Sequence, residues 1–234
     1  MKAILASQNA HKAQEFATAI HSIEVVPAPH GVEVDENADD FIGNARLKAR
    51  AYAAEFAQNA LADDSGLCVD ALNGDPGVHS QRFAVMGRDV DNDPDRTAAN
   101  NRKLLRHLAN VPESKRGAHF SCALCLVVVE PDDIRTMIER AHEPVPQNAR
   151  FSFYDAENRE VDKDCDGIVR AELAFEAQAH GHILTEKHGQ GGFGYDPLFF
   201  SPDAGCTFAE LTCEQKLTVS HRGRAIAILR EIFK

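Results

Sequence analysis

Leu61–Ala84 reads LADDSGLCVDALNGDPGVHSQRFA, and its opening places two adjacent carboxylates, Asp63 and Asp64, directly after a short apolar segment. Ser65 and Gly66 follow them. This order predicts a strand that ends in a tight loop, which is where open α/β sheets bind ligands. Adjacent carboxylates repel each other unless water or a cation lies beside them, and Mg²⁺ prefers oxygen ligands of this kind. The same residue types are common in solvated turns, so the stretch alone leaves both interpretations open.

Length and charge limit the class of protein. A chain of 234 residues can form one large domain or two small lobes, and its helical and strand-like patterns alternate from end to end, which predicts an α/β fold. The formal net charge of −11 argues against a general nucleic-acid or membrane-surface binder, because both need a basic surface. It allows a small anionic substrate held in a local basic pocket.

Targeting signals are not recognisable in the chain. No apolar run reaches the roughly 20 residues that a membrane-spanning helix needs, and the start of the chain does not resemble a signal peptide. Cys122 and Cys125 have the CxxC spacing within the strand-like run SCALCLVVV, where residues three apart face opposite sides and cannot readily share a metal ion. We therefore expect a cytoplasmic protein whose six cysteines are reduced and mostly buried.

The first elements form a strand–loop–helix pattern. Lys2–Ala6 is apolar and predicts a strand, and Ser7, Gln8 and Asn9 precede a predicted helix that Asn9 could cap. Backbone N–H groups at such a helix start, with Lys12 nearby, favour a phosphate site. Simple capping with a solvated lysine is the alternative. The apolar residues expected on the buried face of this helix are Ala13, Phe16, Ala17 and Ile20.

An irregular acidic stretch, Val25–Asp40, precedes a second helix. Arg46, Lys48 and Arg50 lie off much of its apolar stripe, so they are either solvated or able to reach a phosphate. The stripe consists of Ile42, Ala45, Ala49, Tyr52, Ala53 and Phe56.

Further elements follow from turn and capping signals. Leu67, Val69 and Ala71 alternate as in a strand, and Asn73–Gly77 is typical of a turn. Asp93 and Pro94 predict the start of a third helix, with the cap followed by proline at the first position. The long apolar run His119–Glu130 predicts a central strand.

The segment from about 131 to 177 differs from the rest of the chain. Residues 130–176 hold 13 acidic and 6 basic side chains, which gives a balance of −7. Asp162, Asp164 and Asp166 resemble the opening of a calcium loop, but its twelfth position is Leu173 rather than glutamate. Phe151 and Phe153 suggest strands within this segment, and we predict a solvated acidic hairpin inserted into a single domain that spans residues 1–234.

Two further motifs lie near the end of the chain. Gly189–Pro197 is rich in glycine, which permits close backbone approach, and its Phe193 and Tyr195 could stack on a flat ring or belong to the core. Ser220 predicts the N-cap of a last helix, so His221 and Arg222 fall in its first turn, where the helix dipole does not favour cations. The expected packed face of that helix is Ala225, Ile226, Leu229, Ile232 and Phe233.

Five segments occur in order with compatible spacing: SQNAHK, FIGNARLKA, ADDSGLCVDALNGDPGVHSQRFA, GGFGYDPLFF and SHRGRA. Together they resemble the inosine/xanthosine triphosphate pyrophosphatase family, the house-cleaning enzymes for non-canonical purine nucleotides. The resemblance implies an elongated α/β fold with a mixed sheet, flanking helices and two lobes around a central substrate cleft. It also implies a homodimer and Mg²⁺-dependent hydrolysis of ITP, dITP and XTP to the monophosphate and pyrophosphate.

The resemblance also assigns roles by position. Asp64 corresponds to the general base and a metal-associated carboxylate, and Glu36, together with Asp35, to the second acidic metal ligand. Lys48 and Ser65 correspond to contacts with the phosphate chain or with metal-bound water. The remaining substrate-binding positions are Ser7, Gln8, Asn9 and Lys12 for the phosphates, Phe193, Gly194, Tyr195 and Asp196 for the base and sugar, and Lys216, His221 and Arg222 at the end of the chain.

Three features depart from the family pattern. Gln8 and His11 stand where the family usually has glycine, and Gly43 stands where it usually has glutamate. The acidic stretch from Pro131 to about His182 is longer than the family norm, and we expect it to form a surface hairpin or an added dimer contact. Two alternatives follow: a pyrophosphatase with another base preference, or a nucleotide-binding protein without turnover.

Overall fold

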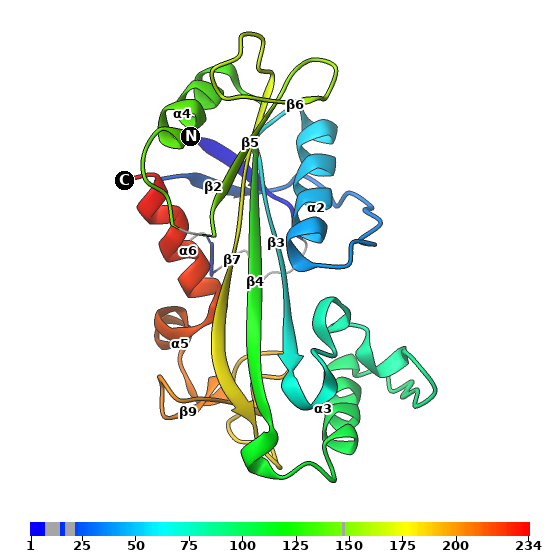
Figure 1. Cartoon of the computed structure of the whole chain (residues 1–234). Coiled ribbons are helices and arrows are strands. Elements are labelled where there is room, and N and C mark those ends of the chain that lie inside the picture. The colour runs from blue at the N-terminus through cyan, green and yellow to red at the C-terminus, as the bar shows by residue number, and fades with distance from the viewer. Residues whose placement is uncertain (8–14, 17–21, 147) are drawn as a thin grey trace. The chain divides into compact units, whose positions relative to one another are not determined.

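The computed structural model describes residues 1–7, 15–16, 22–146 and 148–234 (Figure 1). Nine strands of the described residues form one mixed sheet, with the main order β2-β1-β3-β4-β7-β5-β6 and with β8 and β9 attached through β7. The predicted α/β class is confirmed. The chain divides into two compact units, and the divisions fall within β3, β4, β7 and α6.

Unit 1 comprises residues 1–64, 123–176 and 225–234. Its parallel strands β1, β2 and β3 meet in the order β2-β1-β3, and β5 pairs antiparallel with β6 and β7. The elements lying wholly or partly in this unit are β1 (Lys2–Leu5), β2 (Glu24–Pro27), α2 (Phe41–Phe56), β3 (Ala60–Val69), β4 (Gly117–Val128), α4 (Pro131–Ala141), β5 (Arg150–Tyr154), β6 (Glu160–Val161), β7 (Arg170–Ile183) and α6 (His221–Ile232).

Unit 2 comprises residues 65–122 and 177–224. Beyond its share of β3, β4, β7 and α6, it contains α3 (Arg96–His107), β8 (Phe199–Ser201), β9 (Cys206–Thr207), α5 (Cys213–Val219) and the short 3₁₀ helices η1 (Asp70–Leu72), η2 (Gly77–His79), η3 (Phe83–Val85), η4 (Glu113–Lys115) and η5 (Phe208–Glu210). Its core is a cluster of aliphatic and aromatic side chains that includes Phe120, Phe199 and Phe208.

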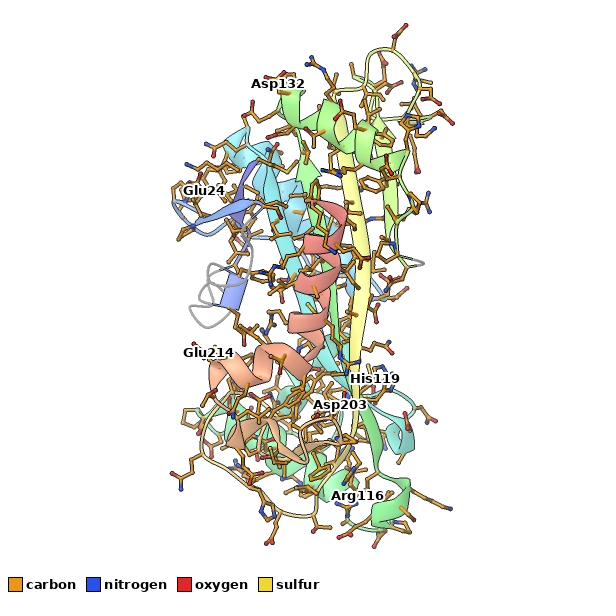
Figure 2. The ribbon with its side chains drawn as sticks, turned by 90° about the vertical axis from the view of Figure 1, so that its left-hand side faces the viewer. Glu24, Arg116, His119, Asp132, Asp203 and Glu214 are labelled. Carbon is orange, nitrogen blue, oxygen red and sulfur yellow. The ribbon has the colours of Figure 1, made fainter. Side chains whose placement is uncertain are left out.

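A buried cation, Arg116, also holds unit 2 together. Arg116, labelled in Figure 2, is 5% exposed and donates hydrogen bonds to the carbonyl oxygens of Leu108, Val111 and Leu184. These bonds fix the segment that leads from α3 into β4, because the guanidinium satisfies three backbone acceptors, of which the Leu108 carbonyl is buried and the other two are part-buried.

The strand that holds the carboxylate pair is longer than predicted. The sequence predicts a loop at Asp64 between a short strand and the strand-like alternation at Leu67 and Val69, but β3 continues without interruption to Val69. Because β3 lies between β1 and β4, its neighbours satisfy its backbone groups on both edges. Alternation along the strand then places Asp63 and Asp64 on opposite faces. Asp63 is fully buried and Asp64 is half-buried.

Two other predictions need correction. The third helix begins at Arg96 rather than after Asp93, because Asp95 is its N-cap and accepts a hydrogen bond from the backbone of Ala98 at 3.0 Å. The acidic segment from 131 to 177 contains the strand β5 at Phe151 and Phe153, where a strand was predicted, but it also contains the helix α4, whose first turn includes Asp132 (Figure 2).

Several predictions are confirmed. The second helix is α2, with Phe41, Asn44 and most of the predicted stripe buried. The predicted central strand is β4, the turn at residues 73–77 is present, and the packed face of α6 is buried as expected. Ser220 accepts a hydrogen bond from the backbone of Gly223 at the start of that helix, as a cap should.

The cysteine prediction is only partly right. None of the six cysteines, all of which lie among the described residues, forms a disulfide; Cys122 and Cys125 are buried, but Cys165 and Cys213 are exposed. The helix predicted after Asn9 lies mostly outside the described residues, although Phe16 is fully buried as expected of its inner face. Among the helices that the structure describes, none combines the length and apolar character required to cross a membrane.

Candidate active site

A half-buried lysine lies between two carboxylates in unit 1. The Nζ of Lys48 is 2.8 Å from Oε2 of Glu36 and 3.4 Å from Oδ1 of Asp64. The side chains of Lys48 and Asp64 are 13% and 14% exposed. Three predicted site residues, from an irregular segment, from α2 and from β3, are therefore brought together.

One face of α2 supplies this cluster. Residues four apart in a helix share a face, and Asn44 and Lys48 both reach Asp64 on β3, beside which α2 lies in Figure 1. The Nδ2 of Asn44 donates to Oδ2 of Asp64 at 3.2 Å, while its Oδ1 accepts from the backbone of Ala38 at 3.0 Å. Asn44 is 1% exposed, so it orients the Asp64 carboxylate from a fixed position.

The charge of Lys48 is stabilised by its surroundings. Burial alone would lower the pKa of its ammonium, but the negative charges of Asp64 and Asp63 and the hydrogen bond to Glu36 raise that pKa above its ordinary value. Lys48 is therefore a permanent cation at neutral pH, and its ammonium lies between the carboxylates of Glu36 and Asp64.

Exposure alternates along residues 31–38, which separates Asp35 from Glu36. Glu36 turns inward to Lys48, whereas Asp35 is exposed and accepts a hydrogen bond from Nδ2 of Asn37 at 3.1 Å. Asp35 and Glu36 are both predicted metal ligands, and Glu36 is the one that contacts Lys48.

Glycine at position 43 allows close packing at the start of α2. A Cβ at this position would lie 2.6 Å from the Cβ of Ala38 and 2.9 Å from Oδ1 of Asp40. Asp40 is the N-cap of α2, and its Oδ1 accepts from the backbone of Gly43 at 2.6 Å. The glycine therefore lets the acidic segment pack directly on the helix that presents Asn44 and Lys48.

The residues of this cluster fit a magnesium ion. Among the described residues, no group of three histidine, cysteine or carboxylate side chains is close enough to hold a metal. Mg²⁺ does not need such a cage, because it is commonly bound by one or two carboxylates together with water and substrate phosphates. Glu36 and Asp64 provide two such carboxylates, both within 3.4 Å of one cation, the Lys48 ammonium.

Unit 2 contains a second buried pair. The Nζ of Lys216 on α5 lies 2.6 Å from Oδ2 of Asp196, and their side chains are 6% and 2% exposed. The same Asp196 oxygen accepts the backbone N–H of Phe193 at 2.7 Å. Lys216 also lies 4.4 Å from the centre of the Phe193 ring. Asp196 therefore fixes both the glycine-rich loop and the lysine that lies against its aromatic side chain.

The first turn of α6 adds two more buried cationic or titratable groups. Arg222 is 1% exposed, its Nη2 donates to the hydroxyl of Ser65 at 3.3 Å, and its guanidinium lies 6.0 Å from the centre of the Phe193 ring. His221 stacks on Phe120 with ring centres 4.8 Å apart and an interplanar angle of 12°. The predicted residues Ser65, Phe193, Asp196, Lys216 and Arg222 thus form one connected group.

Tyr195 and Gly194 support this group from the core side. The Tyr195 ring is 4% exposed and belongs to the unit 2 core, and its hydroxyl donates to the carbonyl of Ser80 at 2.9 Å. Burial raises the pKa of that phenol. The carbonyl of Gly194 accepts from Nδ2 of Asn101 at 2.8 Å.

Some predicted residues cannot be placed and some useful ones were missed. Gln8, Asn9 and Lys12 lie outside the described residues, while Ser7 follows β1 and its backbone N–H bonds the carbonyl of Leu5. Sequence reasoning missed Asn44, Asn101 and Phe120. The only signal for Asn44 is its spacing of four residues before Lys48.

The fold is mixed α/β, and each of its two units places a lysine beside a carboxylate, Lys48 with Asp64 and Lys216 with Asp196. Residues 3–144 and 152–232 match the model of the Ham1 family. This match covers most of the chain, which therefore belongs to the Ham1 family.

Individual relatives match this chain over nearly their full length. The chain is 37% identical to a dITP/XTP pyrophosphatase of Thioalkalivibrio sulfidiphilus, covering 99% of this chain and 97% of that protein, and 38% identical to one of Desulforamulus reducens, covering 99% and 95%. Among solved structures, it resembles the Ham1 protein of Staphylococcus aureus, with a TM-score of 0.69, 30% identity and coverage of 99% and 97%. It also resembles a nucleoside-triphosphatase described as a dITP/XTP pyrophosphatase from Mycobacterium abscessus, with a TM-score of 0.63, 35% identity and coverage of 98% of both chains.

Proposed function

We propose that this chain is a magnesium-dependent nucleoside triphosphate pyrophosphatase that hydrolyses dITP, XTP and ITP to the monophosphate and pyrophosphate. The observation that carries the proposal is the cluster of Asp64, Lys48 and Glu36, in which a permanent cation lies between two carboxylates. Full-length relatives named dITP/XTP pyrophosphatases support the choice of substrate.

In unit 1, we assign Asp64 as the general base. Its carboxylate is oriented by Asn44, and a carboxylate held in this way can position a water molecule and accept its proton as the water attacks phosphorus. Lys48 lies beside it and provides positive charge for the phosphate oxygens. Ser7, Gln8, Asn9 and Lys12 remain our candidates for further phosphate contacts.

Glu36 and Asp64 would hold the magnesium ion, and Asp35 is a weaker candidate because it is exposed and bonds Asn37. When bound, Mg²⁺ would neutralise the charge that builds on the phosphate oxygens during hydrolysis. The two carboxylates are then no longer balanced by Lys48 alone, which leaves the lysine able to contact the substrate.

In unit 2, we assign recognition of the base to Phe193, His221 and Arg222, with Ser65, Gly194, Tyr195, Asp196 and Lys216 supporting them. N–H donors fixed in a buried site can bind the 6-keto oxygen of hypoxanthine or xanthine. The amino group of adenine would leave such donors without an acceptor, which a buried site penalises strongly. Selection against ATP follows from this chemistry.

The test is pyrophosphate release from dITP, XTP, ITP, GTP and ATP, with and without Mg²⁺. We expect turnover that needs Mg²⁺ and is fastest with the hypoxanthine and xanthine nucleotides. The Asp64→Asn variant should keep its fold and lose about two or more decades of turnover, while Asp39→Asn, which removes an exposed carboxylate, should not. Rapid turnover of another triphosphate would show that the enzyme prefers a different substrate. Binding of a triphosphate without release of pyrophosphate would refute the proposed activity.

We also propose a cytoplasmic homodimer. None of the six cysteines, all within the described part of the chain, forms a disulfide, which suits a reducing compartment, and the family resemblance implies the dimer. Light scattering in solution should give twice the 25.6 kDa mass of the chain, and a mass equal to that of one chain would contradict the dimer.

A further inference from the structure

Unit 1 contains a cluster of arginines that the proposed reaction does not use. We call Arg46, Arg50 and Arg170, which surround Glu172, the arginine cluster. The carboxylate of Glu172 on β7 is fully buried, and Arg50 donates to both of its oxygens, from Nε and from Nη2, at 2.8 Å each. Arg170 approaches the same carboxylate at 3.0 Å, and Arg46 approaches it at 4.0 Å.

These charges do not balance. Three guanidiniums share one carboxylate, and the neighbouring pair of Arg150 and Glu160, 2.8 Å apart, adds one charge of each sign. Arg150, followed by the Ser152 hydroxyl and the more distant Arg46, lowers the pKa of the Glu160 carboxyl, so Glu160 stays ionised and its charge is already counted. The group therefore has two positive charges in excess, in a chain whose net charge is −11.

Hydrogen bonding within the cluster is also incomplete. Among the described residues, the Nε atoms of Arg46 and Arg170 have no hydrogen-bond acceptor with suitable geometry, although both atoms are buried. Two neutral groups contact the cluster: Asn158, whose Oδ1 accepts from Nη2 of Arg170 at 2.7 Å, and Tyr154. The hydroxyl of Tyr154 accepts from Arg50 at 3.0 Å, and the guanidinium of Arg170 lies 4.1 Å from the centre of the Tyr154 ring.

A purely structural role accounts for only part of this arrangement. One buried carboxylate is satisfied by the two-pronged contact that Arg50 makes, which is the strong geometry for such a pair. The Arg46 guanidinium lies 4.0 Å from the Glu172 carboxylate and adds little attraction at that distance, while its removal from water costs free energy. Side-chain exposures of 26% for Arg46 and 39% for Arg50 leave the cluster open to a ligand from solution.

The cluster lies apart from the proposed catalytic residues. Arg46 and Arg50 are four residues apart and share one face of α2, whereas Asn44 and Lys48 share another. The first pair reaches Glu172 on β7, and the second pair reaches Asp64 on β3.

We infer that the arginine cluster binds a doubly charged phosphate-class anion, because its excess charge is +2 and guanidiniums match phosphate oxygens in pairs. The anion can come from free phosphate or pyrophosphate, or from the 5′-phosphate of a nucleotide. Since Arg170 already covers the Tyr154 ring, the phosphate is the part recognised.

Calorimetric titration of the full chain tests this inference, with a chelator present to remove divalent cations. The probes are inorganic phosphate, pyrophosphate and inosine 5′-monophosphate. Arg46→Gln should weaken binding about tenfold, the effect of losing one charge-assisted contact, whereas Arg135→Gln, an exposed arginine of α4 paired with Asp132, should bind as the wild type does. Lys48→Gln should also retain the site that Arg46→Gln loses.

A second variant separates binding from a structural role. Glu172→Gln keeps the shape of the side chain and removes the internal negative charge, so anion binding should become several-fold tighter and the variant should gain thermal stability when phosphate is added. Equal affinities for Arg46→Gln and the wild type, or loss of the site in Lys48→Gln, would overturn the inference. If phosphate or pyrophosphate binds more tightly than inosine 5′-monophosphate, the source is the free anion. If the monophosphate binds more tightly, the source is a nucleotide.

Discussion

The side-chain amide of Asn44 donates a hydrogen bond to Asp64, from Nδ2 to Oδ2 over 3.2 Å. Asn44 cannot move freely, because it is 1% exposed and its oxygen accepts the backbone N–H of Ala38. The carboxylate proposed as the general base is therefore oriented by a helix residue that is itself tied to the acidic segment before that helix.

Replacing Asn44 by alanine tests this orientation. We expect kcat to fall about tenfold, because a misplaced base loses part of its advantage, and the free energy of unfolding to fall by about 1–3 kcal/mol as the Ala38 N–H loses its acceptor. A hydrogen bond to a carboxylate favours its ionised form, so the acidic limb of the pH–rate profile should move to higher pH. Asn37→Ala, at an exposed position, is the control. An unmoved pH profile would leave Asn44 with a structural role alone.

Lys48 gives a prediction for stability against pH. Its folded-state pKa is raised above 10.5, because the attraction of Asp64, Asp63 and Glu36 exceeds the effect of burial. A raised pKa means that the folded state binds the proton more tightly, so the stabilisation is complete at lower pH and is lost as the pH rises through the raised value. Urea unfolding should show the wild type more stable than Lys48→Met by about 1 kcal/mol at pH 7 and at pH 9. The difference should shrink at pH 11, and a difference that grows there would contradict the sign.

The pair of Asp196 and Lys216 should behave as a unit. Both side chains are almost completely buried and their charged atoms are 2.6 Å apart, so removing one partner leaves an uncompensated charge in a dry interior. Asp196→Asn should cost about 3–5 kcal/mol in chemical unfolding. Adding Lys216→Met to that variant should recover part of the loss, because the stranded ammonium is removed. Additive losses in the double variant would mean that the two residues do not interact.

Local sequence signals predicted most elements of the fold correctly. The periodicity of α2, the apolar run of β4 and the cap of α6 each depend on residues close together in the chain. The strand β3 was cut short in the prediction, because Asp, Ser and Gly are also turn residues and only the neighbouring strands β1 and β4 show that this segment is a central strand. The helix α4 was missed for a similar reason, since its acidic composition concealed the buried Ile134 and Met137.

The site residues divide in the same way, into those that the sequence predicts and those that only the fold brings together. The motif resemblance singled out Glu36, Lys48 and Asp64 before any contact was known, and the structure places them together. It could not identify Asn44, whose role depends on a contact between α2 and β3. The acidic segment could not be understood from charge alone either, because Glu172 within it is a buried partner of Arg50, and Leu173 and Phe175 beside it are core residues. A deletion of 131–177 would therefore remove part of the sheet.

The glycine-rich loop offers a matched pair of substitutions. Gly192 and Gly194 both have positive φ, +69° and +62°, so alanine at either position costs about 1–2 kcal/mol of backbone strain. A Cβ at Gly194 meets nothing within 4 Å, whereas a Cβ at Gly192 would lie 2.2 Å from Oδ2 of Asp196. That oxygen accepts the hydrogen bonds of Lys216 and the Phe193 backbone, so Gly192→Ala must displace it. We expect Gly192→Ala to be the less stable variant in urea unfolding by at least about 1 kcal/mol and to raise KM for dITP, while Gly194→Ala shows the strain alone. Equal stability and equal KM in the two variants would mean that Asp196 can move without consequence, and that it does not hold the loop in place.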